Sequence, residues 1–109
     1  MEFKQIVAIM RTFVLDDVES RLRDLGVPGI TVSRVKGFGE GANVLTRDWI
    51  SAYARIDVFA DAVQAQQIVD TILQSAHSGQ PGDGIVAVLP VDNIYRIRDH
   101  HRLQERRAT

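Results

Sequence analysis

The order of apolar and polar positions along the chain predicts four main β-strands. Residues 3–11 are a short, mostly apolar run that predicts a buried strand. Residues 30–35 and 50–59 alternate apolar and polar side chains, which predicts two half-buried strands. Residues 85–89 are continuously apolar and predict a central strand.

Two further segments repeat their apolar residues at helical spacing. The first helix is expected to begin at a cap formed by Asp16 or Asp17 and to stop at Gly26. The second is expected to begin at an Asp61 cap and to run to about Ala76. Their expected inner faces are Leu15, Val18, Leu22 and Leu25 in the first helix, and Ala62, Ala65, Val69, Ile72, Leu73 and Ala76 in the second.

The C-terminal part alternates again. Residues 94–98 read Ile-Tyr-Arg-Ile-Arg, which predicts a short fifth strand that places Arg96 and Arg98 on one face. Residues 99–109 are expected to form a polar tail after a domain that spans residues 1–98.

The element order β-α-β, β-α-β predicts an α+β fold, the ferredoxin-like βαββαβ sandwich. Its antiparallel sheet carries both helices on one face. The first and fourth strands are apolar on both faces, so the second face of the sheet is expected to be covered by another subunit.

Composition narrows the class of protein. The 109 residues suit one domain, and 45% apolar content suffices for a modest core. There is no cysteine, no apolar run of the roughly 20 residues that span a bilayer, and the charged residues 1–4 do not resemble a signal peptide. A cytoplasmic protein without membrane insertion is expected. The net charge of −1 argues against nucleic-acid binding.

Two glycine-bearing segments, residues 35–41 and 78–84, carry the candidate chemistry. Glycine permits positive φ and close approach of the backbone to a ligand, and clustered amides bind anions. With Arg96 and Arg98, these loops predict a site for a phosphorylated ligand. The alternative is that the glycines form ordinary turns and the arginines pair with surface carboxylates.

On these segments the chain resembles the P-II signal-transduction proteins over residues 3–98. The likeness rests on six stretches in the family's order: Phe13-Val14-Leu15-Asp16-Asp17-Val18, Gly29-Ile30-Thr31-Val32, Val35-Lys36-Gly37-Phe38-Gly39, Val69-Asp70-Thr71-Ile72, Gly82-Asp83-Gly84 and Arg96-Ile97-Arg98.

The resemblance implies a homotrimer with an adenine nucleotide in the cleft between neighbouring subunits. It implies that the adenine pocket is lined by Ile9, Gly29, Thr31 and Phe59, and that the base of the first loop supports it through Gly37, Phe38 and Gly39. The phosphate-binding amides are expected from Gly82, Asp83 and Gly84, and the adjacent chain is expected to add Arg96 and Arg98. No metal site is expected.

The chain also departs from the family's pattern. Gln80 and Ile85 stand where two lysines of the second loop are usual, and Tyr53 replaces a lysine at the far base of the first loop. Glu40 and Gly41 replace an arginine and a glutamine. Fewer cations and an added carboxylate favour ADP or AMP over ATP, and the loss of glutamine and lysine argues against 2-oxoglutarate binding.

The signalling loop, residues 39–51, is shorter than in typical relatives and lacks the tyrosine that is uridylylated. Its Leu45, Arg47 and Trp49 have the composition of an interaction hot spot, or Trp49 packs at the loop base. By analogy with short-loop relatives, the partner could be a membrane transporter and the co-effector bicarbonate, in control of inorganic-carbon uptake.

The leading hypothesis is therefore a non-enzymatic sensor of adenine nucleotides that regulates a partner through this loop. No credible pair of nucleophile and base is present. Two alternatives remain: a trimeric adaptor that binds no ligand, and a trimer of the metal-tolerance type, for which His100 and His101 would be the candidate ligands.

Overall fold

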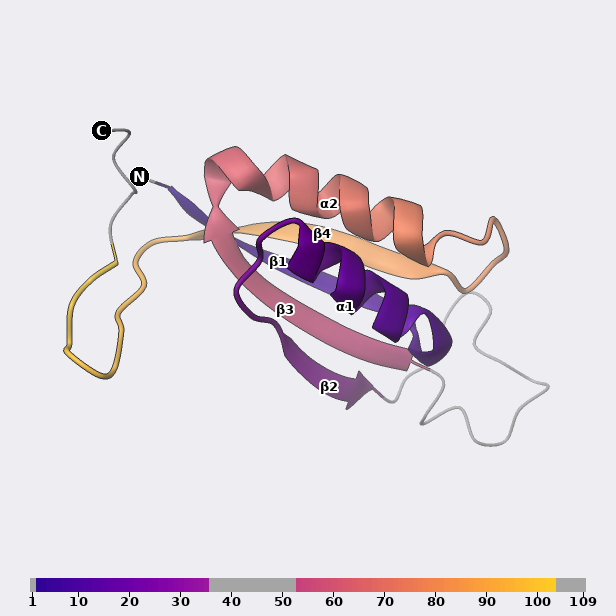
Figure 1. Cartoon of the computed structure of the whole chain (residues 1–109), viewed down its shortest axis with the longest axis horizontal. Coiled ribbons are helices and arrows are strands. Elements are labelled where there is room, and N and C mark those ends of the chain that lie inside the picture. Colours follow the sequence, from indigo (N-terminus) through magenta and orange to yellow (C-terminus); the bar gives the residue numbers. More distant parts are fainter. Residues whose placement is uncertain (1, 36–52, 104–109) are drawn as a thin grey trace.

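The computed structural model describes residues 2–35 and 53–103, and it confirms the ferredoxin-like fold. Four strands form one antiparallel sheet in the order β2-β3-β1-β4, with both helices on one face (Figure 1). The elements are β1 (Phe3–Arg11), η1 (Thr12–Val14), α1 (Leu15–Asp24), β2 (Thr31–Val35), β3 (Tyr53–Asp61), α2 (Ala62–Ala76) and β4 (Gly84–Val91). The first residues of the strand predicted over 50–59 lie outside the described residues. No helix in the described ranges combines the length and the hydropathy needed to cross a bilayer.

The core lies between the sheet and the helices. Along β1 from Ile6 onward, and along β3, the even-numbered side chains point toward the helices and are buried, because successive side chains of a strand point to opposite faces. The largest fully buried side chains come from both layers: Ile6, Met10, Ile56 and Val58 from the strands, and Val18, Leu22, Ile68 and Ile72 from the helices.

The start of α1 differs from the sequence prediction. Neither Asp16 nor Asp17 caps the helix; it begins at Leu15 after Val14, which makes no side-chain cap. The 3-10 turn η1 runs directly into α1, because the Leu15 amide donates to the Thr12 carbonyl, so no extended capping residue intervenes. Asp16 and Asp17 lie instead in the first turn, where their negative charges interact favourably with the positive end of the helix dipole.

Gly26 ends α1 as predicted. It has a φ of +97°, and its amide donates to the Arg23 carbonyl at 3.0 Å. The next amide, of Val27, donates to the Leu22 carbonyl at 3.1 Å. This pair of bonds is the Schellman arrangement, and the buried Val27 and Leu22 add the hydrophobic contact that accompanies it.

Asp61 caps α2, as the sequence predicted. Its Oδ1 accepts a hydrogen bond from the Val63 amide at 3.1 Å. We expect Asp61→Ala to lower the free energy of unfolding by about 1 kcal/mol, the usual cost of losing such a cap. Urea denaturation would measure this, with Asp92→Ala at an exposed position as the control. A loss no larger than that of the control would contradict a capping role.

The predicted strand over residues 94–98 is wrong. Only an isolated bridge joins Tyr95 to Arg102, and residues 97–99 form a turn. Backbone hydrogen bonds of 2.7–2.8 Å link Arg96 to His101 and Leu103 to Ile94, so residues 94–103 fold back on themselves. The alternating pattern was misleading because this hairpin-like arm finds its hydrogen-bond partners within itself and extends away from the sheet (Figure 1).

The second face of the sheet has no cover among the described residues. It exposes apolar side chains, with 56% of Phe59, 64% of Ile85 and 39% of Leu89 accessible. A polar cluster interrupts them: Asp57 accepts hydrogen bonds from Arg55 and Gln5, each near 3.0 Å. The bond from Arg55 is the main reason why the pKa of Asp57 lies below its usual value.

Candidate functional site

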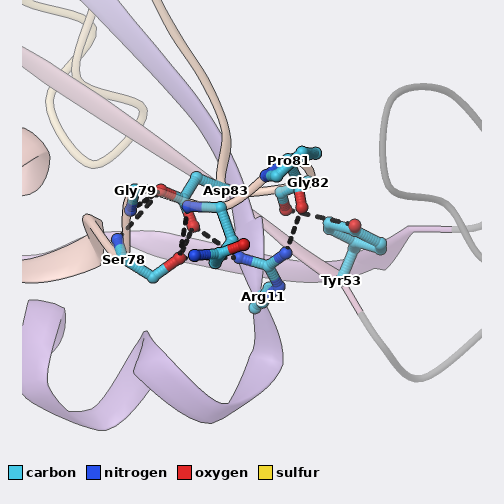
Figure 2. A network of polar contacts seen from close by, with 8 residues as sticks. Arg11, Tyr53, Ser78, Gly79, Pro81, Gly82 and Asp83 are labelled. Carbon is cyan, nitrogen blue, oxygen red and sulfur yellow. Dashed lines mark hydrogen bonds and ion pairs between the residues drawn. The ribbon is translucent and has the colours of Figure 1, made fainter.

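The candidate site is built on the loop between α2 and β4, residues 77–83. The last residue of β1, Arg11, and the first residue of β3, Tyr53, are paired in the sheet register, so both lie at the sheet end that this loop reaches. Figure 2 shows their side chains directed at the loop.

Asp83 organises the first half of this loop. Its Oδ2 accepts hydrogen bonds from the amides of Ser78 and Gly79, each at 2.9 Å. Its Oδ1 contacts the Ser78 hydroxyl and the Arg11 guanidinium (Figure 2). The Ser78 hydroxyl also accepts from the Gln80 amide at 3.2 Å. The amides of residues 78–80 are therefore satisfied within the loop.

These donors shift the titration of Asp83. The Ser78 hydroxyl and then the Ser78 amide are the largest causes, and they hold the pKa of this carboxyl well below its usual range. A carboxyl group whose pKa is depressed in the folded state stabilises that state above its unfolded pKa, near 3.9, and loses this contribution as the pH falls toward the folded pKa.

We therefore expect the thermal midpoint of the protein to fall as the pH decreases from about 4 toward 2, partly because Asp83 becomes protonated. In Asp83→Asn, which cannot titrate, the fall over the same interval should be smaller. Calorimetric scans at several pH values would measure the difference, with the exposed Asp92→Asn as the control. Equal pH profiles for the wild-type protein and Asp83→Asn would refute the assignment.

The second half of the loop is held by the sheet. An Arg11 nitrogen donates to the Pro81 carbonyl at 2.5 Å, and the Tyr53 hydroxyl donates to the Gly82 carbonyl at 3.1 Å. No acceptor for the amides of Gly82 and Asp83 lies among the described residues. This half thus presents two unpaired donors, whereas the first half presents none.

Gly84 joins the loop to β4 and approaches β1 more closely than any other residue type could. Its φ is +107°, and a Cβ atom placed there would lie 1.8 Å from the Ile9 carbonyl oxygen. Gly82 also has a positive φ, of +94°. Both glycines are therefore needed for the path of the backbone, whatever the loop binds.

Beside the loop, a half-open groove of about 150 Å³ runs between α2 and β4. Its lining is mainly apolar, with Asp83 and His77 as the polar side chains; the apolar lining includes Ile9, Met10, Ile72, Leu73, Ala76, Ile85 and Val86.

The residues predicted to form an adenine pocket are only partly gathered within one chain: Thr31 pairs with Asp57 and so lies near Phe59, but Ile9 lies apart. Ile9 and Phe59 share the uncovered face of the sheet, but Phe59 pairs with Gln5, four residues from Ile9, which separates them by about 13 Å. Thr31 opens β2 at the sheet edge, and Gly29 precedes it in an exposed segment. A pocket made of these residues therefore needs more than one chain.

The two predicted phosphate-binding arginines also lie apart from the loop within one chain. β4 runs from the loop to the other end of the sheet, and the arm that carries Arg96 and Arg98 extends beyond that end (Figure 1). Arg96 pairs with Asp99, which raises the pKa of the guanidinium and lowers that of the carboxyl. Arg98 is exposed.

Other predicted residues lie outside the described part of the chain: Gly37, Phe38, Gly39, Leu45, Arg47 and Trp49. Sequence reasoning missed Arg11, Ser78 and the contact of Tyr53. Arg11 is a charged residue at the end of an otherwise mostly apolar strand, and this position is a sequence signal that could have identified it as a site residue. Within residues 2–35 and 53–103, no three histidine, aspartate or glutamate side chains gather in a way that could hold a metal ion.

Comparison with known proteins supports one family. The model of the family "Nitrogen regulatory protein P-II" matches residues 3–101. The P-II protein of Synechocystis sp. is 36% identical over 102 residues, which cover 87% of this chain and 91% of that protein. The P-II homolog of Arabidopsis thaliana is 31% identical over 93% of this chain and 56% of its own length. A crystal structure of Arabidopsis PII bound to citrate superposes with a TM-score of 0.78 at 31% identity, covering 94% of this chain and 86% of that one.

Proposed function

Since the chain belongs to the nitrogen regulatory protein P-II family of regulatory signalling proteins, we propose that it binds an adenine nucleotide between subunits of a homotrimer and thereby regulates a protein partner. The observation that carries this proposal is a loop, held in place by Arg11 and Tyr53, in which the amides of Gly82 and Asp83 find no acceptor among residues 2–35 and 53–103. Backbone amides of this kind bind phosphate oxygens. The Arabidopsis relative was solved with citrate, a small polyanion, which is consistent with anion binding in this family.

Two features that one chain leaves incomplete support the proposed trimer. The uncovered sheet face exposes Phe59, Ile85 and Leu89, and burial of such apolar area is favourable at about 25 cal/mol per Å². The arm with Arg96 and Arg98 lies at the opposite end of the sheet from Gly82, so in this proposal it contributes to the site of a neighbouring chain. Both needs are met when identical chains close around one axis.

The ligand we propose is ADP or AMP rather than ATP. Gln80 within the loop and Ile85 just after it are uncharged, so the outer phosphates of ATP would meet fewer cations there. The Tyr53 hydroxyl is already bonded to Gly82, and a phenol supplies no positive charge for a dicarboxylate such as 2-oxoglutarate. The proposal includes a small anion such as bicarbonate as the co-effector.

The partner contact is assigned to residues 39–51, with Leu45, Arg47 and Trp49 as its anchors, and a membrane transporter is the partner class we favour. The protein would act without catalysis and in the cytoplasm. A change in the order of a loop upon ligand binding is a common way to pass such a signal to a partner.

Calorimetric titration with ATP, ADP, AMP and cyclic AMP, each with and without 2-oxoglutarate or bicarbonate, tests this function. We expect binding of ADP or AMP that 2-oxoglutarate does not alter, and a bicarbonate effect would indicate carbon control. If none of these nucleotides binds, the proposal fails.

A second candidate, an adaptor that needs no ligand, is favoured by two internal contacts. Asp83 already satisfies the amides of Ser78 and Gly79, and Asp99 already neutralises Arg96. An adaptor would bind its partner equally well with and without nucleotide, so a partner-binding assay in both conditions separates the two candidates.

A further inference from the structure

Three consecutive residues of the loop between α2 and β4 accept hydrogen bonds through their oxygen atoms from side chains of the sheet. Arg11 donates to the Pro81 carbonyl, Tyr53 donates to the Gly82 carbonyl, and Arg11 donates again to the Asp83 carboxylate (Figure 2). Both donors come from the same register position of β1 and β3, so the rigid sheet fixes where these oxygens lie.

The direction of these oxygens decides the direction of two amides. A trans peptide is planar, with its C=O and N–H on opposite sides, and the described residues contain no cis peptide. Because the Pro81 carbonyl points at Arg11, the Gly82 N–H points away from it. Because the Gly82 carbonyl points at the Tyr53 hydroxyl, the Asp83 N–H points away from Tyr53.

The second of these peptides depends on Tyr53 in particular. Gly82 has no Cβ, so the peptide between Gly82 and Asp83 has little intrinsic preference for one orientation, and the bond of 3.1 Å from Tyr53 selects it. Gly82 is also buried, and a buried N–H without an acceptor is unfavourable. An anion placed on the far side of the loop from Arg11 and Tyr53 would supply an acceptor for both amides.

We propose that Tyr53 is a positioning residue, which orients the Asp83 amide toward a phosphate group of the nucleotide, beside the Gly82 amide that Arg11 orients. The inference rests on the proposed function and deepens it. It also gives a role to the tyrosine that stands where relatives carry a lysine. Its hydroxyl fixes the orientation of a loop peptide by a hydrogen bond, and the amide of that peptide binds the ligand.

Tyr53→Phe removes the hydroxyl and keeps the ring. We expect the affinity for ADP and AMP to fall about threefold to tenfold, the range that one hydrogen bond contributes. The affinity for adenosine, measured by competition with ADP, should not change, because adenosine has no phosphate for the amides. The matched control is Tyr95→Phe, which removes the hydroxyl of an exposed tyrosine in the arm.

The outcomes separate this inference from the proposed function. If the wild-type protein binds ADP and Tyr53→Phe binds it equally well, the inference is overturned and the proposed function stands. An equal loss for ADP and adenosine also overturns it, because the ring would then act on the pocket as a whole. If the wild-type protein binds no ADP, both fail. A loss confined to ligands with phosphate supports both.

Discussion

Gly84→Ala is expected to destabilise the protein more than any other exchange of one glycine in the described residues, by about 4 kcal/mol or more, the upper end of single substitutions. The added Cβ would lie 1.8 Å from the carbonyl oxygen and 2.8 Å from the carbonyl carbon of Ile9. Both atoms belong to the backbone of β1, so no side chain can move aside. β4 would have to separate from β1 at Met10, its register partner.

Gly26→Ala is the control that isolates the clash. Gly26 has a similar φ, of +97°, but no atom lies within 4 Å of the place of its Cβ. Its substitution should therefore cost only the strain of a left-handed residue, about 1–2 kcal/mol. Denaturant unfolding of both variants gives the comparison. Similar losses in the two variants would show that the strand contact is not as close as the structure has it.

Most of the fold could be predicted from the sequence, because short-range periodicity and burial agree in this chain. The strand over residues 3–11 was predicted with its observed bounds, and the positions of Asp61 and Gly26 gave the start of α2 and the end of α1. The start of α1 was mispredicted because two adjacent aspartates look like caps whether they precede a helix or occupy its first turn. Only the turn before the helix decides this, and its residues carry no strong signal.

The candidate site was predictable only in part. Glycines at residues 82 and 84 were identified from their spacing, but the contacts that shape the loop join residues about 70 positions apart, such as Arg11 and Asp83. Sequence periodicity does not report such pairs. The alternation over residues 94–98 predicted a strand, yet a strand needs a neighbour, and within the described residues this segment pairs only with its own continuation.

The second large effect is expected on ADP affinity, when Arg96 and Arg98 of the arm are replaced. We expect the double variant Arg96→Ala/Arg98→Ala to bind ADP about 10- to 100-fold more weakly, because each charged hydrogen bond to phosphate contributes about 1.5–3 kcal/mol and part of that is lost in breaking existing contacts. Arg96 must release or share Asp99, whereas Arg98 is exposed. The single variant of Arg98 should therefore show the larger part of the loss.

Arg23→Ala, which removes an exposed arginine of α1 on the other side of the core, is the matched control for charge. It should leave ADP binding unchanged, and the double variant should leave adenosine binding unchanged, since in the proposed site the arginines contact phosphate alone. Calorimetric titration of the wild-type protein, the double variant and Arg23→Ala with ADP and adenosine tests this, and the oligomeric state of each protein is measured in parallel. A double variant that keeps the oligomeric state of the wild type and binds ADP equally well would show that the arginines are not part of the site. Because Arg96 and Arg98 lie at the far end of the sheet from Gly82, a specific loss in this variant would also mean that each nucleotide is bound by two chains, so that ligand occupancy and trimer assembly depend on each other.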